Sequence, residues 1–252
     1  MTITPYLIGG AQTDFARNWS REGKTFLDVL RAAVEGALDD AGLDLGEVAR
    51  LAREDRVQAF VGNFQADQFL KQAHLGAFLT EADPAFHGVP SARYEAACAS
   101  GSVALDAAAT KIRAGDCDLA VVVGIEVMRN VPVEQGNDYL GAAAVYEDEA
   151  RGVPFVFPVI FGRLTDRILA RANGAPESRI LDALSEISRT NFANAKANPN
   201  AQTRAWDVSP ERMKARDEES RDVYGGRTRY SDCCQVTDGA AAVLLASPRY
   251  AK

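Results

Sequence analysis

The chain has 252 residues, of which 47% are hydrophobic and 25% charged, and its formal net charge is −7. This length and hydrophobic content allow one large domain or two modest ones with a buried core, which excludes a disordered chain and a coiled coil. The acidic balance excludes broad nucleic-acid binding through a basic face. However, residues 151–230 hold 14 basic and 10 acidic residues, whereas residues 1–150 hold 12 and 23. The basic segment favours a local anionic ligand.

The four cysteines, Cys98, Cys117, Cys233 and Cys234, show no Cys-x-x-Cys spacing and no accompanying pair of histidines. The sequence therefore predicts neither a disulfide framework nor a zinc or other metal site. Residues 1–10 have no basic n-region and no cleavage signature, and no run approaches the roughly 18 apolar residues of a membrane span. We expect a cytoplasmic protein that is neither exported nor bound to a membrane.

Apolar periodicity alternates between strand-like and helix-like spacing along the chain, which is typical of an α/β fold. Thr25, followed by Asp28 three residues on, predicts the N-cap of a helix that ends at Gly42. The other predicted elements, in chain order, are strands at 6–10 and 57–61, a weaker helix at 69–79, a strand at 93–97, a helix at 101–114, and strands at 119–123 and 240–246.

The most regular stretch is the strand at 93–97, the helix at 101–114 stopped by Gly115, and the strand at 119–123. The last strand is continuously apolar, which indicates burial on both faces. This is a βαβ unit, so we expect parallel strands and a right-handed crossover.

The pattern breaks after Glu126, where glycines and prolines mark loops between helical stretches at 164–172, 180–195 and 210–220. We expect a mainly helical insertion over residues 127–230. It interrupts a discontinuous core domain formed by residues 1–126 and 231–252.

Cys98 is the candidate nucleophile because it lies where a predicted strand ends and a predicted helix begins. Backbone N–H groups and the helix macrodipole favour a thiolate there, and either Ser100 or Ser102 can cap the helix. In open parallel sheets, ligand sites gather at the carboxyl ends of strands, where Cys98 falls. The alternative is a small core residue, because cysteine is often buried.

These and other stretches resemble the thiolase family. Residues 94–101 around Cys98 resemble its nucleophile motif, and the insertion resembles the loop domain of the sterol-carrier-protein type of thiolase. In the core, residues 7–15 resemble the family's opening strand, residues 114–118 the end of the helix after the nucleophile, and residues 124–128 a Gly-x-Glu-x-Met turn. Residues 161–162 and 197–202 carry the resemblance to the loop domain. Residues 237–242 resemble the turn that re-enters the N-terminal domain.

The resemblance implies a thiolase fold, with an N-terminal parallel or mixed sheet covered by helices and a mainly helical loop domain. It implies an enzyme in which Cys98 attacks a 3-oxoacyl-CoA and carries the acyl group, which coenzyme A then accepts; the reverse is a Claisen condensation. Acyl-CoA and coenzyme A are substrates, and no tightly bound cofactor is implied.

The resemblance also implies roles for four binding residues. Met128 would line the acyl side of the pocket, with a core residue as the alternative. Cys234 would face the coenzyme, with a buried small residue in a turn as the alternative. Arg163 and Arg167 would bind the phosphorylated nucleotide end of coenzyme A, which suits arginine, with solvated surface charge as the alternative.

The sequence departs from the family because it corresponds to the N-terminal half and loop domain only. A complete thiolase has a second half with a histidine that activates the nucleophile and a second cysteine; neither Gly-His-Pro nor Cys-x-Gly occurs here. We interpret His74 and His87 as structural. The expected general base therefore comes from a missing second half, in the same or a separate chain.

The resemblance further implies a homo-oligomer, and it allows a small OB-fold protein associated with acyl-CoA as a partner. Two alternative functions stay open. One is a non-catalytic scaffold or acyl-CoA-binding subunit, which the missing histidine favours. The other is a thiolase-like retro-aldol lyase acting on a 3-hydroxyacyl-CoA; the presence of Cys98 argues against it, because that chemistry needs no acyl-enzyme.

Overall fold

The computed structural model describes residues 3–172, 174–207 and 228–251. The chain divides into two compact units. The core unit comprises Met1–Asn130 and Thr237–Lys252, and the insert unit comprises Val131–Val236. The corresponding borders predicted from the sequence lie after residues 126 and 230.

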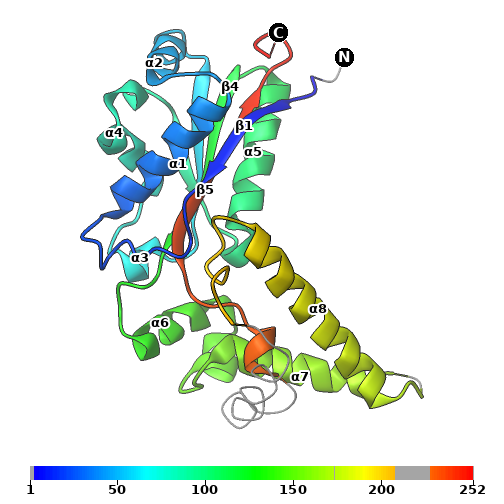
Figure 1. Cartoon of the computed structure of the whole chain (residues 1–252). Helices are drawn as coiled ribbons and strands as arrows, with labels where there is room; N and C mark the ends of the chain where they lie inside the picture. The colour runs from blue at the N-terminus through cyan, green and yellow to red at the C-terminus, as the bar shows by residue number, and fades with distance from the viewer. Residues whose placement is uncertain (1–2, 173, 208–227, 252) are drawn as a thin grey trace. The chain divides into compact units, whose positions relative to one another are not determined.

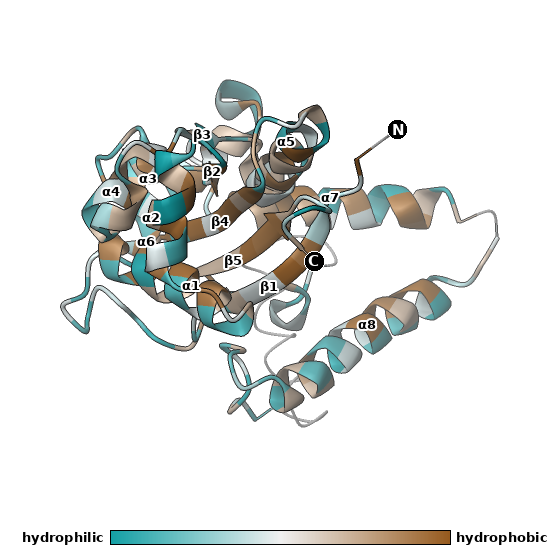
Figure 2. Cartoon of the chain, turned by 90° about the horizontal axis from the view of Figure 1, so that it is seen from above, coloured by the Kyte–Doolittle hydropathy of each residue, from teal (hydrophilic) through white to brown (hydrophobic). Residues whose placement is uncertain are grey.

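The core unit, which contains β1, β4 and β5 in Figure 1, has a five-stranded mixed sheet in the order β1–β5–β4–β2–β3, with all five strands labelled in Figure 2. β2 (Val57–Gly62) pairs in parallel with β3 (Ser91–Tyr94) on one side and β4 (Leu119–Val127) on the other. β5 (Asp238–Ala246) runs antiparallel between β4 and β1 (Tyr6–Gln12). The predicted parallel direction of the strands on either side of the Cys98 helix is confirmed, and β2 lies between them.

Helices cover both faces of this sheet (Figure 2). α1 (Phe26–Asp40) packs on β1, β5 and β4, whereas α5 (Ser100–Ala114) packs on the opposite face against β2, β3 and β4. The side chains of β4 alternate accordingly. Those of Val121, Val123 and Ile125 belong to the α1 side of the core, and those of Ala120 and Val122 to the α5 side. The prediction that the strand at 119–123 is buried on both faces is confirmed.

α1 begins at the predicted residue. Thr25 Oγ1 accepts a hydrogen bond from the N–H of Asp28 at 3.4 Å, and the Asp28 carboxylate accepts one from the N–H of Thr25 at 2.8 Å. This capping box satisfies two N–H groups that the helix itself leaves free. Gly42, with φ +67°, follows the helix in the left-handed conformation that glycine adopts readily.

The predicted helix at 69–79 is wrong as a single element. Lys71 and His74 have φ of 57° and 68°, and left-handed residues of this kind interrupt a right-handed helix. The segment forms three short pieces instead: α3 (Ala66–Phe69), the 3₁₀ helix η1 (Leu75–Phe78) and α4 (Leu79–Ala82).

The strand predicted at 93–97 also ends early, at Tyr94. Ala97 has φ +49°, so the chain has left the extended conformation before Cys98. The core unit also contains α2 (Leu45–Arg53) and the 3₁₀ helix η2 (Pro84–Phe86).

The insert unit is mainly helical. The predicted helix at 164–172 overlaps α7 (Val156–Ala170), which ends two residues earlier than predicted. It also starts earlier, because Pro158 falls in its first turn, where no intrahelical N–H is needed. The predicted helix at 180–195 is part of α8 (Glu177–Ala197), and the one at 210–220 lies outside the described residues. The other elements are α6 (Val133–Leu140), the 3₁₀ helices η4 (Gly141–Ala143) and η6 (Tyr230–Asp232), and a π-helical turn, η5 (Tyr146–Ala150).

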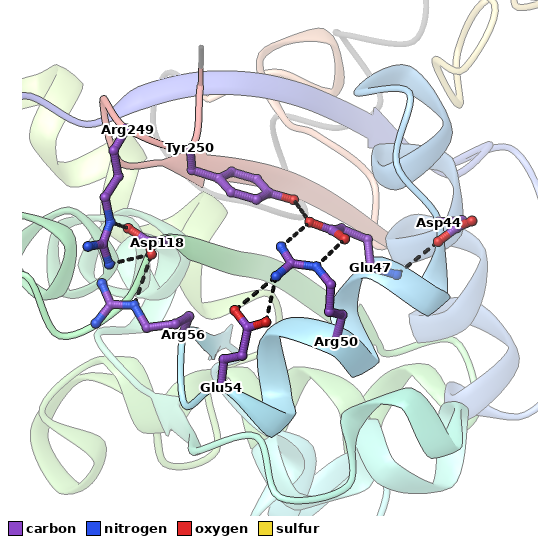
Figure 3. A network of polar contacts seen from close by, with 8 residues as sticks. All are labelled: Asp44, Glu47, Arg50, Glu54, Arg56, Asp118, Arg249 and Tyr250. Carbon is purple, nitrogen blue, oxygen red and sulfur yellow. Dashed lines mark hydrogen bonds and ion pairs between the residues drawn. The ribbon is translucent and has the colours of Figure 1, made fainter.

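A network of charged side chains lies at the end of the sheet where β2 and β4 begin (Figure 3). Asp118 accepts hydrogen bonds from Arg56 at 2.9 Å, Arg249 at 2.5 Å and the Ser247 hydroxyl at 2.6 Å. Burial by itself would raise the pKa of Asp118, but these three donors outweigh it and hold the pKa well below the usual range. The segment after β5 is thereby bound to the start of β4.

A second part of the network binds this segment to α2 (Figure 3). Glu47 accepts hydrogen bonds from Arg50 and, at 2.7 Å, from the hydroxyl of Tyr250. The hydrogen bonds from Arg50 lower the pKa of Glu47 to about 2. Arg249 therefore binds the residue directly before β4, and its neighbour Tyr250 binds α2.

We predict that Asp118→Asn lowers the free energy of unfolding by about 1–3 kcal/mol at pH 7, because two guanidinium groups lose their charged acceptor. The native pKa of Asp118 lies below the value of about 3.9 for an unfolded aspartate, so its contribution is fully present above that pH. The contribution disappears as the pH falls through the native pKa.

Urea unfolding at pH 7 and pH 3 measures both effects. The matched control is Asp116→Asn, which removes the partner of Lys111 in an exposed pair and is expected to change stability by no more than about 1 kcal/mol. Equal losses in the two variants at pH 7 would contradict the prediction.

Candidate active site

Cys98 lies in the turn that joins β3 to α5. The turn is the 3₁₀ helix η3 (Ala97–Ala99), and the Cys98 side chain is exposed, unlike that of Cys117, which is buried. The alternative interpretation of Cys98 as a core residue is therefore wrong. The φ of +49° at Ala97 is uncommon for a residue with a side chain, and strained backbone of this kind is concentrated at functional sites.

Ser100 holds this turn together. Its buried hydroxyl accepts a hydrogen bond from the N–H of Ala96 at 3.0 Å and donates one to the carbonyl of Ala97 at 2.6 Å. The prediction that Ser100 or Ser102 caps α5 is wrong: the N-cap is Ala99, and no side chain caps the helix. The first turn of α5 thus keeps N–H groups without a side-chain acceptor, and these form the positive end of the helix macrodipole next to Cys98.

The first turn of α5 rests on the end of β2. A Cβ atom at Gly62 would lie 2.7 Å from both Cα and N of Gly101 and 2.8 Å from the carbonyl carbon of Ser100. Only glycine permits this approach, because the obstructing atoms belong to the backbone. The absence of a side chain at Gly62 therefore lets the first turn of α5, which follows Cys98, lie against the end of β2.

Asn63 joins the ends of three strands through its backbone and its buried side chain. Its N–H donates to the carbonyl of Tyr94 at 3.1 Å, and its Nδ2 donates to the carbonyl of Ile125 at 2.7 Å and to Glu126 Oε2 at 3.0 Å. Its Oδ1 accepts from the N–H of Ala66 at 2.9 Å. The last residues of β2, β3 and β4 are therefore tied together.

Glu126 is half-buried beside this junction, and its Oε1 accepts a hydrogen bond from the N–H of Phe64 at 2.5 Å. Burial raises the pKa of Glu126 to about 7, although the hydrogen bond from Phe64 and the positive charge of Arg93 act in the opposite direction. Arg93 donates to the carbonyls of Asn63 at 3.3 Å and Phe64 at 2.6 Å. The carboxylate thus titrates near neutral pH in surroundings of mostly uncharged donors.

Met128 directly follows β4, and its side chain is half-buried. Its N–H and that of Arg129 donate to Oδ1 of Asp238 at 2.9 and 2.8 Å, and Asp238 is fully buried at the start of β5. Within the described part of the chain, the second carboxylate oxygen of Asp238 has no hydrogen-bond partner. The backbone of Met128 is therefore held by the strand that returns from the insertion.

The other three predicted binding residues belong to the insert unit. Arg163 and Arg167 are one turn apart on α7, and both are exposed, as is Cys234. The alternative of a buried small residue at Cys234 is therefore wrong. The predicted site residues are thus divided, with Cys98 and Met128 in the core unit and these three in the insert unit.

Both histidines, His74 and His87, are exposed and flank short 3₁₀ helices of the core unit. Among the described residues, no group of three His, Cys, Asp or Glu side chains is arranged as metal ligands would be.

The sequence alone predicts no role for Gly62, Asn63, Asp238 or Glu126. Asn63 comes two residues after the end of the strand predicted at 57–61, at the carboxyl end where ligand sites gather, and this position is a usable signal. Glu126 is part of the Gly-x-Glu-x-Met stretch, but the spacing alone does not reveal which groups its carboxylate meets.

The chain belongs to the thiolase family, because residues 6–224 match the thiolase N-terminal domain. It is 29% identical to acetyl-CoA acetyltransferase of Methanothermobacter thermautotrophicus over 240 residues, which are 95% of this chain and 56% of that protein. It is also 29% identical to acetyl-CoA acetyltransferase of Methanocaldococcus jannaschii over 246 residues, 98% of this chain and 56% of that protein. The chain thus spans about half the length of these relatives.

Two solved structures share the fold. The Ltp2-ChsH2(DUF35) aldolase has a TM-score of 0.67 at 19% identity and matches 98% of this chain and 56% of its own. Acetyl-CoA acetyltransferase from Syntrophomonas wolfei has a TM-score of 0.60 at 15% identity and matches 99% of this chain and 66% of its own. The predicted α/β thiolase fold is confirmed. No helix in the described ranges is long and apolar enough to cross a membrane.

We predict that Gly62→Ala lowers the free energy of unfolding by about 1–3 kcal/mol, because the added methyl group meets the backbone of Gly101. The matched control is Gly124→Ala. Gly124 pairs with Gly62 across β2 and β4, but its added Cβ would meet its nearest neighbour, the Ala241 carbonyl, at 4.0 Å. Urea unfolding compares the two variants, and an equal effect of both would contradict the close approach of α5.

Proposed function

We propose that the chain is the nucleophile-bearing part of a thiolase-type acyltransferase that cleaves or forms 3-oxoacyl-CoA. The observation that carries the proposal is the exposed thiol of Cys98 in the strained turn directly before α5. The family membership and the two curated relatives named acetyl-CoA acetyltransferase support the same chemistry.

In the proposed reaction, the Cys98 thiolate adds to the 3-keto carbon of the substrate. The bond between C2 and C3 then breaks, its electron pair takes a proton at C2, and acetyl-CoA leaves while the acyl group stays on sulfur. A coenzyme A thiolate next adds to this acyl group, and the Cys98 thiolate departs. The uncapped N–H groups at the start of α5 favour the negative charge on sulfur in both steps.

The proton transfers need a base, which we assign to a complementary thiolase half in the same or a separate chain. The span of about half the relatives' length supports this assignment. So do the exposed apolar side chains of Val103 and Leu105 on α5 and of Tyr6 and Leu7 on β1, since apolar surface of this kind fits a protein partner.

Further partners are part of the proposal. A homo-oligomer is expected of the family, and the fold neighbour whose name joins Ltp2 to ChsH2(DUF35) supports a small associated protein. We also propose a cytoplasmic location.

Coenzyme A is the proposed anionic ligand of the insert unit. Arg163 and Arg167 present two guanidinium groups one turn apart on an exposed helix, which suits phosphate groups. Cys234 and Met128 complete the proposed substrate contacts, the first toward the coenzyme and the second toward the acyl chain.

We predict that acetyl-CoA acetylates Cys98 when the complementary half is present, because that half supplies the base. Intact-protein mass spectrometry and peptide mapping, after incubation with acetyl-CoA and with acetoacetyl-CoA, locate the acetyl group. Cys98→Ser should abolish this label, whereas Cys117, which is buried and whose pKa burial raises to about 11, should stay unlabelled in the wild-type chain.

The same experiment separates the alternatives. Absence of label on Cys98 in the complete assembly would overturn the acyl-carrier role. Cleavage of a 3-hydroxyacyl-CoA that survives Cys98→Ser would indicate a retro-aldol lyase, and binding of acyl-CoA without turnover would indicate a scaffold subunit.

We also predict that Arg163→Ala and Arg167→Ala each raise the KM for coenzyme A roughly three- to tenfold with little change in kcat, because exposed charge contacts contribute modestly to binding. The effect should weaken at high salt. Arg113→Ala, an exposed arginine on α5, is the control, and an equal change in that variant would contradict a specific role for α7.

A further inference from the structure

We infer that Asn63 and Glu126 are positioning residues for Cys98, which hold the turn between β3 and α5 at the ends of β2 and β4. The inference rests on the proposed role of Cys98 as the acyl carrier. It extends that role to two side chains that belong to other strands.

The first step concerns the backbone on either side of Cys98. Four residues before it, the carbonyl of Tyr94 accepts the hydrogen bond from the N–H of Asn63. Three residues after it, Gly101 lies against Gly62, the neighbour of Asn63. Residues 62 and 63 therefore locate both sides of the turn, so a shift of this strand end moves Cys98.

The second step concerns what holds Asn63. Its Nδ2 faces two acceptors, the Ile125 carbonyl and Glu126 Oε2, while its Oδ1 faces the N–H of Ala66. A rotated amide would place donor against donor and acceptor against acceptor, which is costly for a side chain that is 1% exposed. The carboxylate of Glu126 thus helps to select one orientation of Asn63.

The third step concerns the charges that face Glu126. Arg93 on β3 is the cation whose charge acts on it, and Arg93 is itself paired with Asp67 on α3 at 3.0 Å. The other donors that face Glu126 come from the loop after β2. They are the backbone N–H groups of Phe64 and Gln65 and the side-chain amide of Asn63. A proton on the Glu126 carboxyl would face donors and weaken these bonds, so ionised Glu126 is the form that positions Cys98.

The position of Cys98 affects its reactivity, because the N–H groups at the start of α5 favour the thiolate only while the sulfur stays next to them. Protonation of Glu126, with a pKa of about 7, therefore gives the reactivity of Cys98 a dependence on pH. Glu126 affects Cys98 indirectly, because its hydrogen bonds go to Asn63 and to the N–H of Phe64 in the loop after β2.

The test is the rate of alkylation of Cys98 by iodoacetamide, divided by the rate at Cys234 in the same molecules. Both thiols are exposed, and Cys234 belongs to the insert unit. Peptide mass spectrometry gives this ratio between pH 5.5 and 8.5. Circular dichroism and urea unfolding verify that each variant is folded.

Glu126→Gln and Asn63→Asp should each lower the ratio at least about threefold at pH 8, and Glu126→Gln should remove the step near pH 7. Glu35→Gln on the exposed side of α1 is the matched control and should leave the ratio unchanged.

An unchanged ratio in both single variants would overturn the inference, and so would a loss that Glu35→Gln reproduces. If one single variant does not fold, the other decides, because each breaks the same hydrogen bond from one side. Alkylation needs neither coenzyme A nor a second half. A failure of Cys98 to become acetylated would therefore overturn the proposed function and leave this test intact.

Discussion

The turn that carries Cys98 depends on one close contact, between Gly62 at the end of β2 and the first turn of α5. The helix lies directly on the strand end because a side chain at position 62 would come within 2.7 Å of the backbone of Gly101. β2 also pairs in parallel with β3 and β4. The same strand end therefore locates the last residue of β3, the helix start and the carboxyl end of β4, and Cys98 is exposed where they meet.

The two ends of the sheet hold carboxylates whose pKa values are shifted in opposite directions. At the end where β2 and β4 begin, Asp118 meets two arginines and a hydroxyl, which together outweigh its burial and lower its pKa. At the other end, Glu126 meets mostly uncharged donors, and burial raises its pKa to about 7. Asp118 therefore stays ionised near neutral pH and stabilises the fold there. Glu126, beside the candidate site, can gain a proton in the same pH range.

The core unit by itself accounts for the acyl-carrying half of the proposed chemistry. It supplies the thiol, the macrodipole of α5 and a strained turn, but its two histidines are exposed beside short helices elsewhere in the unit. The proposed base and the coenzyme contacts therefore belong to other parts: a complementary half, and the insert unit with Arg163 and Arg167. This division agrees with a chain that spans 56% of its thiolase relatives.

The sequence by itself determined the capped start of α1 at Thr25, the strand at 119–123 with two covered faces, and Cys98 at a strand-to-helix junction. These features follow from local hydrogen bonding and from apolar periodicity, which are properties of neighbouring residues. The tertiary structure decided that the Ser100 hydroxyl braces the turn instead of capping α5, and that Asn63 joins three strands. It did so because the partners that hold Asn63 are remote in the chain, up to 63 residues away, and only the parallel pairing of β2 with β3 and β4 brings them together.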